Sequence, residues 1–388
     1  MMPLNPALED IPLSIFTELD RRLAACGETR VMPLHQGKTT FRPAVSLRAW
    51  EREEFPLLAH EHAPPAGAAA LRKRAAAHHA RTFGRAVDEE NVIISAGATH
   101  AIATVLAAIV RPGDEVLILS PQWLFARGLV AAAGGVPVEV PVFVELSRDA
   151  AFDFIETIRA ACGSRTVAIY FNTPNNPTGY SMTAEQLQAL VAFAGERDLW
   201  LIADNAYEAY ALDGTPFVEV SSLPRAAERT FAIHSFSKTF AMPGFRIAYA
   251  VVPQAASTVV RKHGLYSVYS IATTSQFAAS QALDGYDDVA RKHNRAAAAA
   301  RDLFEERIAV PHTAVTGGLY SFLDLSGWRG GSCDDFIERC LERGVSLAAG
   351  RVFGQACEDH ARLCFTAVPI DALAEAIDRI NGVYQPPD

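Results

Sequence analysis

The middle of the chain repeats one pattern of apolar and polar positions. A short apolar run rich in β-branched residues is followed by a polar or glycine-containing turn and then by an alanine-rich stretch with helical spacing. Such alternation is typical of α/β proteins with a mainly parallel sheet flanked by helices. The pattern predicts seven strands, at residues 91–96, 115–119, 138–142, 167–171, 200–204, 230–234 and 246–252.

Helices are predicted between most of these strands, for example at residues 99–110 and 183–197. Thr183 and Gln186 have the spacing of a capping box, which marks the beginning of the second helix. The last two strands are separated only by residues 235–245, which is too short a connection for a crossover helix. We therefore expect one strand of the sheet to run antiparallel to its neighbours.

Both ends of the chain differ in sequence pattern from this central block. Residues 1–44 look like a leading helix followed by an extended segment that prolines interrupt. The C-terminal part predicts strands at 319–325 and 361–366 and helices at 290–308, 333–343 and 371–380. We predict a large domain at residues 45–286 and a smaller α+β domain formed by residues 1–44 and 287–388.

Composition and charge restrict the class of protein. Half of the 388 residues are hydrophobic, and 35 Lys and Arg against 44 Asp and Glu give a net charge of −9. An acidic chain without a basic run repels phosphate backbones, so no nucleic-acid partner is expected. No apolar stretch approaches the roughly 18 residues that cross a bilayer, and no signal-peptide pattern begins the chain. The six scattered cysteines suit a reducing compartment, so we predict a cytoplasmic protein without a bound metal.

The first group of residues that could take part in catalysis or ligand binding surrounds a lysine. The run His234-Ser235-Phe236-Ser237-Lys238 follows a predicted buried strand. A lysine at this place suits an amine that must be desolvated to act as a nucleophile or base. Arg246 follows eight residues later, where a returning strand would bring its guanidinium to the same pocket to pair with a phosphate. On these residues alone, a surface lysine in a loop is an equal alternative.

A second group lies at the carboxyl end of another apolar strand, where ligands bind in open α/β sheets. Asp204 ends this strand, and its carboxylate is costly to bury unless a cation meets it. A pyridinium nitrogen would satisfy Asp204, and Tyr207 would add a phenol donor from three residues further on. The alternative is that Asp204 is only a helix N-cap.

Three further motifs follow predicted strands. Asn172-Thr173-Pro174-Asn175-Asn176-Pro177-Thr178-Gly179 forms a turn that leaves asparagine amides free to face a ligand. Gly97-Ala98-Thr99 enters a helix whose N-terminus would bind an anion, and Trp123 would stack on a planar ring. An ordinary turn, a plain helix cap and a core tryptophan are the alternatives. Together the five groups provide what pyridoxal phosphate requires.

These motifs resemble those of the fold-type I, class I/II pyridoxal-phosphate-dependent aminotransferases, the aspartate aminotransferase-like family. The resemblance covers residues 30–385 and preserves the order and spacing of the family's motifs. The matching residues are Asn175-Asn176-Pro177-Thr178-Gly179, Asp204-x-x-Tyr207, Ser235-x-Ser237-Lys238 with Arg246, and Arg362-Leu363-Cys364-Phe365.

The resemblance implies a role for each cofactor-binding residue. Lys238 would form the internal aldimine with pyridoxal phosphate and move the proton at the substrate Cα. Asp204 would keep the ring nitrogen protonated, so that the ring acts as an electron sink. Tyr207 and Asn176 would donate to the phenolate oxygen, and Trp123 would stack on the ring. The residues implied to hold the phosphate are Ala98, Thr99, Ser235, Ser237 and Arg246.

The same resemblance implies the reaction and its substrate site. The enzyme would transfer the α-amino group of an L-amino acid to a 2-oxo acid, as a homodimer with shared active sites. Gly37, Asn176 and Arg362 would form the substrate site, with Arg362 pairing bidentately with the α-carboxylate.

The chain departs from the family pattern at two places. It reads His35-Gln36-Gly37-Lys38 where many relatives have Gly-Glu-Pro or Gly-Asp-Pro, and His62 replaces a tyrosine that reaches the neighbouring subunit's phosphate. These changes leave open a lyase or oxidase of specialised metabolism that carries out β- or γ-elimination or oxidative decarboxylation. A non-catalytic regulator built on the same fold is the third alternative, although the chain has no residues to spare in front for a DNA-binding domain.

Overall fold

The structure is a computed structural model that describes residues 19, 23, 31–43 and 60–384. Its central element is a seven-stranded sheet with the strand order β1-β7-β6-β5-β4-β2-β3. The strands are β1 (Val92–Ser95), β2 (Glu115–Ser120), β3 (Val136–Pro141), β4 (Thr166–Asn172), β5 (Trp200–Asp204), β6 (Thr230–Ser235) and β7 (Ala248–Val251). β7 is antiparallel to both of its neighbours, and every other pair is parallel. The predicted sheet and its single antiparallel strand are therefore confirmed.

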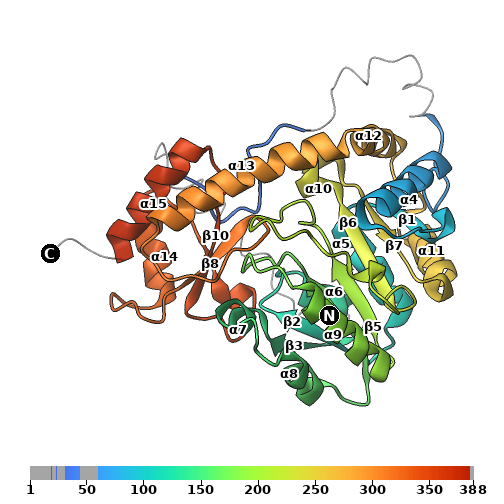
Figure 1. Ribbon diagram of the computed structural model, residues 1–388, viewed down its shortest axis with the longest axis horizontal. Helices are drawn as coiled ribbons and strands as arrows, with labels where there is room; N and C mark the ends of the chain where they lie inside the picture. Colours follow the sequence, from blue (N-terminus) through green and yellow to red (C-terminus); the bar gives the residue numbers. More distant parts are fainter. Residues whose placement is uncertain (1–18, 20–22, 24–30, 44–59, 385–388) are drawn as a thin grey trace, which may run out of the picture.

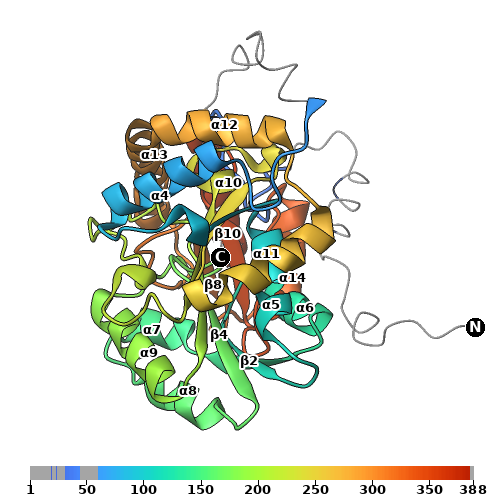
Figure 2. The same ribbon diagram turned by 90° about the vertical axis from the view of Figure 1, so that its right-hand side faces the viewer.

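Helices cover both faces of this sheet, which explains why its strands are apolar on both sides. Along β2, Val116 and Ile118 pack into one core cluster, whereas Leu117 and Leu119 pack into the cluster on the opposite face. One face carries α5 (Ala98–Ile109), α6 (Ala126–Ala132) and α11 (Gln254–Val268), and the other carries α7 (Phe143–Arg148), α8 (Phe154–Ala161) and α9 (Ala184–Glu196) (Figure 2). The predicted helices at 99–110 and 183–197 correspond to α5 and α9.

The helix ends follow local sequence rules. The hydroxyl of Thr183 accepts from the amide of Gln186 at 3.2 Å, and the Gln186 side chain accepts from the amide of Thr183 at 3.0 Å. This is the predicted capping box of α9. A predicted feature that differs is the last strand, which begins at Ala248 rather than at Arg246. Arg246 has φ 49° and ends the short 3₁₀ turn Pro243–Phe245, so it lies before the strand.

A second, antiparallel sheet has the order β8-β10-β9 and lies beside three long helices (Figure 1). Its strands are β8 (Tyr320–Asp324), β9 (Ala348–Ala349) and β10 (His360–Cys364), and the helices are α13 (Tyr286–Arg307), α14 (Cys333–Glu342) and α15 (Ile370–Tyr384). All except the two-residue β9 match predicted elements. Figure 1 shows α13, which begins at the predicted domain boundary, running from α12 (Thr273–Asp284) to α15.

The N-terminal segment 31–43 joins this second core. Met32 and Leu34 pack into the same apolar cluster as buried residues of the C-terminal part, including Phe304 and Phe336. The amide of Met32 donates to the carbonyl of Gly344 at 2.8 Å. This packing is what a small domain assembled from both chain ends requires, and the division at residues 44/45 and 286/287 stays a prediction. The predicted leading helix falls mainly outside the described residues.

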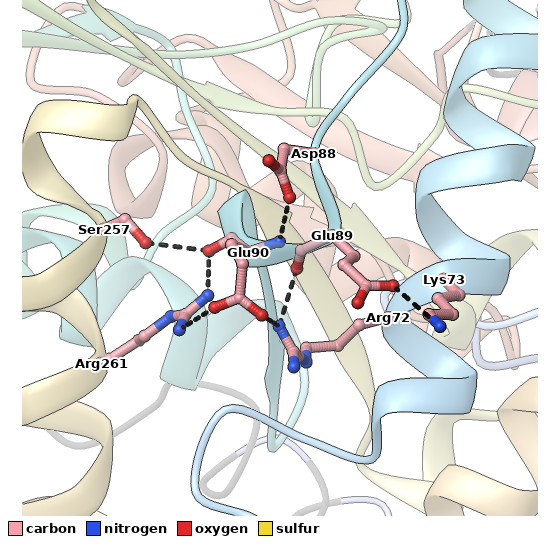
Figure 3. Close-up of polar contacts among 7 residues, drawn as sticks. All are labelled: Arg72, Lys73, Asp88, Glu89, Glu90, Ser257 and Arg261. Atoms are coloured by element: carbon pink, nitrogen blue, oxygen red, sulfur yellow. Dashed lines mark hydrogen bonds and ion pairs between the residues drawn. The ribbon is translucent and has the colours of Figure 1, made fainter.

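A polar cluster fastens α4 (Ala69–Phe83) and α11 to the edge of the large sheet (Figure 3). Glu90, in the 3₁₀ turn before β1, binds Arg72 of α4 at 3.0 Å and Arg261 of α11 at 2.6 Å. The hydrogen bond from Arg261 and that from Arg72 lower the pKa of the Glu90 carboxyl. Ser257 donates to the carbonyl of Glu90 at 2.9 Å. The cluster thus connects two helices that flank β1.

Within the described residues, no helix combines the length and apolar character needed to span a membrane.

Candidate active site

The residues predicted from the sequence motifs line one cavity of about 380 Å³. The cavity lies where β4, β5 and β6 end, beside the N-terminus of α5 and the second sheet. The predicted residues in its wall are Gly37, Ala98, Thr99, Trp123, Asn176, Asp204, Tyr207, Ser235, Ser237, Lys238, Arg246 and Arg362. Segments far apart in the sequence, from both chain ends and the centre, therefore meet at one place.

Lys238 belongs to the short helix α10 (Phe236–Thr239), which follows β6 directly. Its Nζ donates to the carbonyl oxygen of Gly37, so the amine points into the cavity rather than into solvent. Desolvation lowers the pKa of Lys238 to about 8, and the nearby Arg362 and Arg246 act in the same direction. The alternative of a loop lysine on the surface is wrong. An amine with this pKa is partly neutral near physiological pH and can act as a nucleophile or base.

Asp204 ends β5 and is 5% exposed. Tyr170 of β4 donates its hydroxyl to Oδ2 at 3.1 Å, and the amide of Ala206 donates to Oδ1 at 3.1 Å. Burial raises the pKa of Asp204 to about 6, although both hydrogen bonds oppose the rise. Turns rather than a helix follow Asp204, so the N-cap alternative is wrong. A buried carboxylate of this kind is suited to a cationic ring nitrogen.

Four further side chains of the cavity wall contact one another: Tyr207, Tyr320, Asn176 and Arg362. The hydroxyls of Tyr207 and Tyr320 lie 2.8 Å apart, and Asn176 Nδ2 donates to Tyr207 Oη at 3.4 Å. Arg362 Nη1 donates to Asn176 Oδ1 at 2.8 Å, and its Nη2 donates to the carbonyl of His35 at 2.6 Å. Arg362 is 2% exposed, yet it lines the cavity. A guanidinium held in this way can bind a carboxylate through the N–H donors that lie in its plane.

The residues that the sequence predicts to hold a phosphate also lie in the wall of this cavity. Gly97 has φ +84° and precedes α5, and a Cβ atom there would lie 2.6 Å from Arg246 Nη2. The guanidinium of Arg246 therefore lies directly over the helix N-terminus, where Ala98 and Thr99 present free amide groups. Ser235 lines the same wall and accepts from the amide of Ser237 at 3.2 Å. Helix N-terminus, guanidinium and hydroxyl together suit a phosphate.

Trp123 stands in the wall of the cavity as the sequence predicts. Its side chain is half-buried, and it packs edge-on against Phe125 with 5.2 Å between ring centroids. It is not a fully enclosed core residue, so one part of the indole remains available to a ligand.

Comparisons with known proteins agree with this arrangement. Residues 32–380 match the family model described as aminotransferase class I and II. The chain belongs to the class I and II aminotransferase family. This family uses pyridoxal phosphate as its cofactor. The predictions of the family, the fold and transamination are thus confirmed, and the lyase or oxidase alternative is not favoured.

Two curated relatives and one solved structure illustrate the similarity. The chain is 34% identical over 334 residues to a probable aspartate/prephenate aminotransferase of Thermus aquaticus, with 84% of each chain covered. It is also 34% identical over 319 residues to an arginine–pyruvate transaminase of Pseudomonas aeruginosa, covering 81% of this chain and 80% of that protein. The structure of Thermus thermophilus aspartate aminotransferase with maleate matches with a TM-score of 0.90 and 29% identity, covering 99% of this chain and 100% of that one.

Two candidate active-site residues of this aminotransferase were not predicted from the sequence motifs. Tyr320 lines the cavity, and Tyr170 binds Asp204 from behind it. Tyr320 lies in a strand predicted at 319–325 and Tyr170 in one predicted at 167–171, where tyrosine is an ordinary strand residue. Tyr170 and Tyr320 differ from ordinary core tyrosines only in that their hydroxyls lie within hydrogen-bonding distance of Asp204 and Tyr207.

The residues that depart from the family pattern lie in different environments. The His35 ring is buried and its Nδ1 lies 2.7 Å from Ser346 Oγ, although its carbonyl holds Arg362. The carbonyl of Lys38 accepts from Thr366 Oγ1 at 3.1 Å. His62 lines a separate hollow and packs edge-on against Tyr269 at 5.2 Å. Within the described residues, no three His, Cys, Asp or Glu side chains gather into a metal site.

Proposed function

We propose that this aminotransferase uses pyridoxal phosphate to transfer the α-amino group of an L-amino acid to a 2-oxo acid. One observation carries the proposal: an amine, a buried carboxylate, an anion site and a buried guanidinium face a single cavity. Each of these groups is chemically complementary to one part of the cofactor or of an amino-acid substrate.

The chemistry of the donor set fits pyridoxal phosphate. Ala98, Thr99, Ser235, Ser237 and Arg246 would hold the phosphate. Asp204 would face the ring nitrogen, Tyr207 and Asn176 the ring oxygen, and Trp123 the ring. Gly97 fits the same assignment, because any Cβ atom there would displace the Arg246 guanidinium from the helix N-terminus. When bound, the cofactor supplies an electron sink conjugated with the substrate Cα.

Lys238 is the group that we assign to proton movement at the substrate Cα. With its pKa lowered to about 8, about half of the amines are neutral at pH 8, and a base is most effective when its pKa lies near the working pH. The Gly37 carbonyl holds Nζ inside the cavity. Asp204 would remain ionised beside a cationic ring nitrogen, because that positive charge would lower the pKa of Asp204 below the value that burial imposes.

Arg362 is the group that we assign to the substrate α-carboxylate. Its guanidinium is held by Asn176 and by the His35 carbonyl, so little reorganisation is needed when a carboxylate arrives. The low dielectric constant around a buried charge strengthens the interaction. Two relatives at 34% identity have different named substrates, so we propose no single amino acid.

We also propose that the protein is a cytoplasmic homodimer whose active sites are shared between subunits. The resemblance to the family motivates this proposal, and surface residues of α11 support it. Val259, Tyr266 and Val268 are 48%, 86% and 41% exposed, and Tyr269, directly after the helix, is 54% exposed. Large exposed apolar side chains gathered on one helix are typical of an interaction surface.

The experiment that tests transamination supplies the amino donor without an acceptor. Protein loaded with pyridoxal phosphate is mixed with each proteinogenic L-amino acid in turn, and both 2-oxo acid and ammonia are measured. We expect the effective donor to yield about one 2-oxo acid per active site and no ammonia, with turnover resuming once a 2-oxo acid is added. Continuous release of ammonia without an acceptor would contradict transamination and favour elimination or oxidation.

A further inference from the structure

Tyr320 occupies a position in the active site that no motif assigns. It begins β8 of the second sheet, it is 1% exposed, and its side chain reaches the cavity. Its ring covers the guanidinium of Arg362, with 4.5 Å between Arg362 Cζ and the ring centroid. Its hydroxyl lies 2.8 Å from the hydroxyl of Tyr207. One side chain therefore contacts both the substrate end and the cofactor end of the proposed site.

The guanidinium of Arg362 lies against a second aromatic ring as well. Phe353 has its centroid 4.7 Å from Arg362 Cζ, and it packs edge-on against Phe322 in a small apolar cluster. Cations are attracted to the faces of aromatic rings, so both rings restrict the plane of the guanidinium. Only the Tyr320 ring carries a hydroxyl that reaches Tyr207. Phe353 is thus a natural control for the stacking part of the interaction.

The hydroxyl of Tyr320 is also close to the segment that carries Gly37. A Cβ atom on Gly37 would lie 2.3 Å from Tyr320 Oη, so the backbone passes directly over this hydroxyl. The carbonyl of the same glycine accepts from Lys238 Nζ. Any residue larger than glycine would displace Tyr320 or move the carbonyl that holds the lysine.

Tyr207 depends on Tyr320 for its better hydrogen bond. Its other side-chain partner is Asn176, at 3.4 Å, whereas the Tyr320 hydroxyl is at 2.8 Å. Asn176 in turn accepts from Arg362 at 2.8 Å. Tyr207, Tyr320, Arg362 and Asn176 therefore form a closed circuit of contacts. Removing the Tyr320 hydroxyl leaves Tyr207 with only the longer hydrogen bond.

We propose that Tyr320 is a positioning residue with two separable tasks. Its hydroxyl fixes the direction of the Tyr207 hydroxyl, and its ring holds the Arg362 guanidinium in the plane that a carboxylate needs. This inference rests on the proposed function, because Tyr207 and Arg362 act there on cofactor and substrate. It adds that the two ends of the site are coupled through one side chain of the second sheet.

Three variants separate the two tasks. Tyr320→Phe removes only the hydroxyl, Tyr320→Leu removes hydroxyl and ring, and Phe353→Leu removes a ring on Arg362 without touching Tyr207. The first readout is the pH midpoint of the visible absorbance of the loaded protein. The second is the affinity for maleate and for propionate, measured by calorimetry, because both are carboxylates that carry no amino group.

The hydroxyl and the ring are expected to affect different readouts. A donor to the negatively charged ring oxygen stabilises the deprotonated form, so loosening Tyr207 raises the pH midpoint. Tyr320→Phe should raise it by about 0.5 pH unit, less than Tyr207→Phe does, and should change carboxylate affinity less than about twofold. Tyr320→Leu should raise the midpoint similarly and weaken carboxylate binding about tenfold. Phe353→Leu should weaken carboxylate binding and leave the midpoint unchanged.

The outcomes distinguish this inference from the proposed function. If wild-type protein shows no visible absorbance with pyridoxal phosphate and binds neither carboxylate, the proposed function fails. If wild type behaves as expected but Tyr320→Phe keeps the wild-type midpoint, the positioning role is wrong. It is equally wrong if Phe353→Leu shifts the midpoint as far as Tyr320→Phe does, because a general loosening of the site would then explain both. Circular dichroism and thermal melting confirm that each variant is folded.

Discussion

Lys238→Ala is expected to lower kcat for transamination by about 10³-fold or more. The substitution removes the amine that points into the cavity and that we assign to proton movement at the substrate Cα. The reduced pKa of about 8 suits this task, and no other residue in the described wall of the cavity is a lysine. Steady-state kinetics with a donor and acceptor identified by screening measure the effect.

Lys238→Arg is the matched control for this prediction. It keeps a positive charge near Asp204, but a guanidinium does not lose its proton in this pH range, so its activity should be as low as that of the alanine variant. Since burial lowers the pKa of Lys238 to about 8, the neutral fraction of the wild-type amine grows as pH rises toward 8. The wild-type rate should rise over the same range and then level. A wild-type kcat in either variant would contradict the assignment.

Arg362→Lys is expected to raise KM for both the amino acid and the 2-oxo acid by about 100-fold, with a smaller effect on kcat. Lysine keeps the charge but offers one ammonium point in place of a planar pair of donors. It also leaves Asn176 Oδ1 and the His35 carbonyl without the two hydrogen bonds that now hold the guanidinium. KM for several substrates of different side chains measures the effect, which should be similar for all because they share the α-carboxylate.

Arg351→Lys provides the control for Arg362. Arg351 lies in the 3₁₀ turn after β9, its side chain is 47% exposed, and it pairs with Asp334 at the surface. We expect no change of KM in this variant, since exposed ion pairs contribute little and the residue does not line the cavity. If Arg362→Lys left KM unchanged, or if it raised KM for only one substrate, Arg362 would not bind the common carboxylate.

The sequence predicted the elements that obey local rules. The apolar run 200–204 became β5 with the predicted bounds, and Thr183 with Gln186 capped α9. The short connection at residues 235–245 correctly indicated an antiparallel strand, because a parallel return needs a longer crossover. The start of β7 was misplaced because the turn Pro243–Phe245 puts Arg246 in a left-handed conformation, which an apolar pattern does not reveal.

Residues of the candidate site could be predicted from the sequence where reactive or polar side chains follow the ends of predicted strands. Asp204, Asn176 and Lys238 are polar residues at the ends of buried strands, so the topology brings them together. Tyr170 and Tyr320 could not be found in this way, because a tyrosine inside a strand is an ordinary core residue. Their importance depends on which hydroxyl lies within hydrogen-bonding distance, and this follows from packing between two sheets. The sequence likewise could not show that Gly37 passes over Tyr320.

The most direct test of the account is to locate the lysine that holds the cofactor. The protein is loaded with pyridoxal phosphate and treated with borohydride, which fixes the cofactor to the amine that binds it, and peptides are then analysed by mass spectrometry. We expect the added mass on Lys238, and we expect labelling to be lost in Lys238→Ala. Labelling of another lysine, such as Lys38 beside the substrate segment, or no labelling of wild type would contradict it.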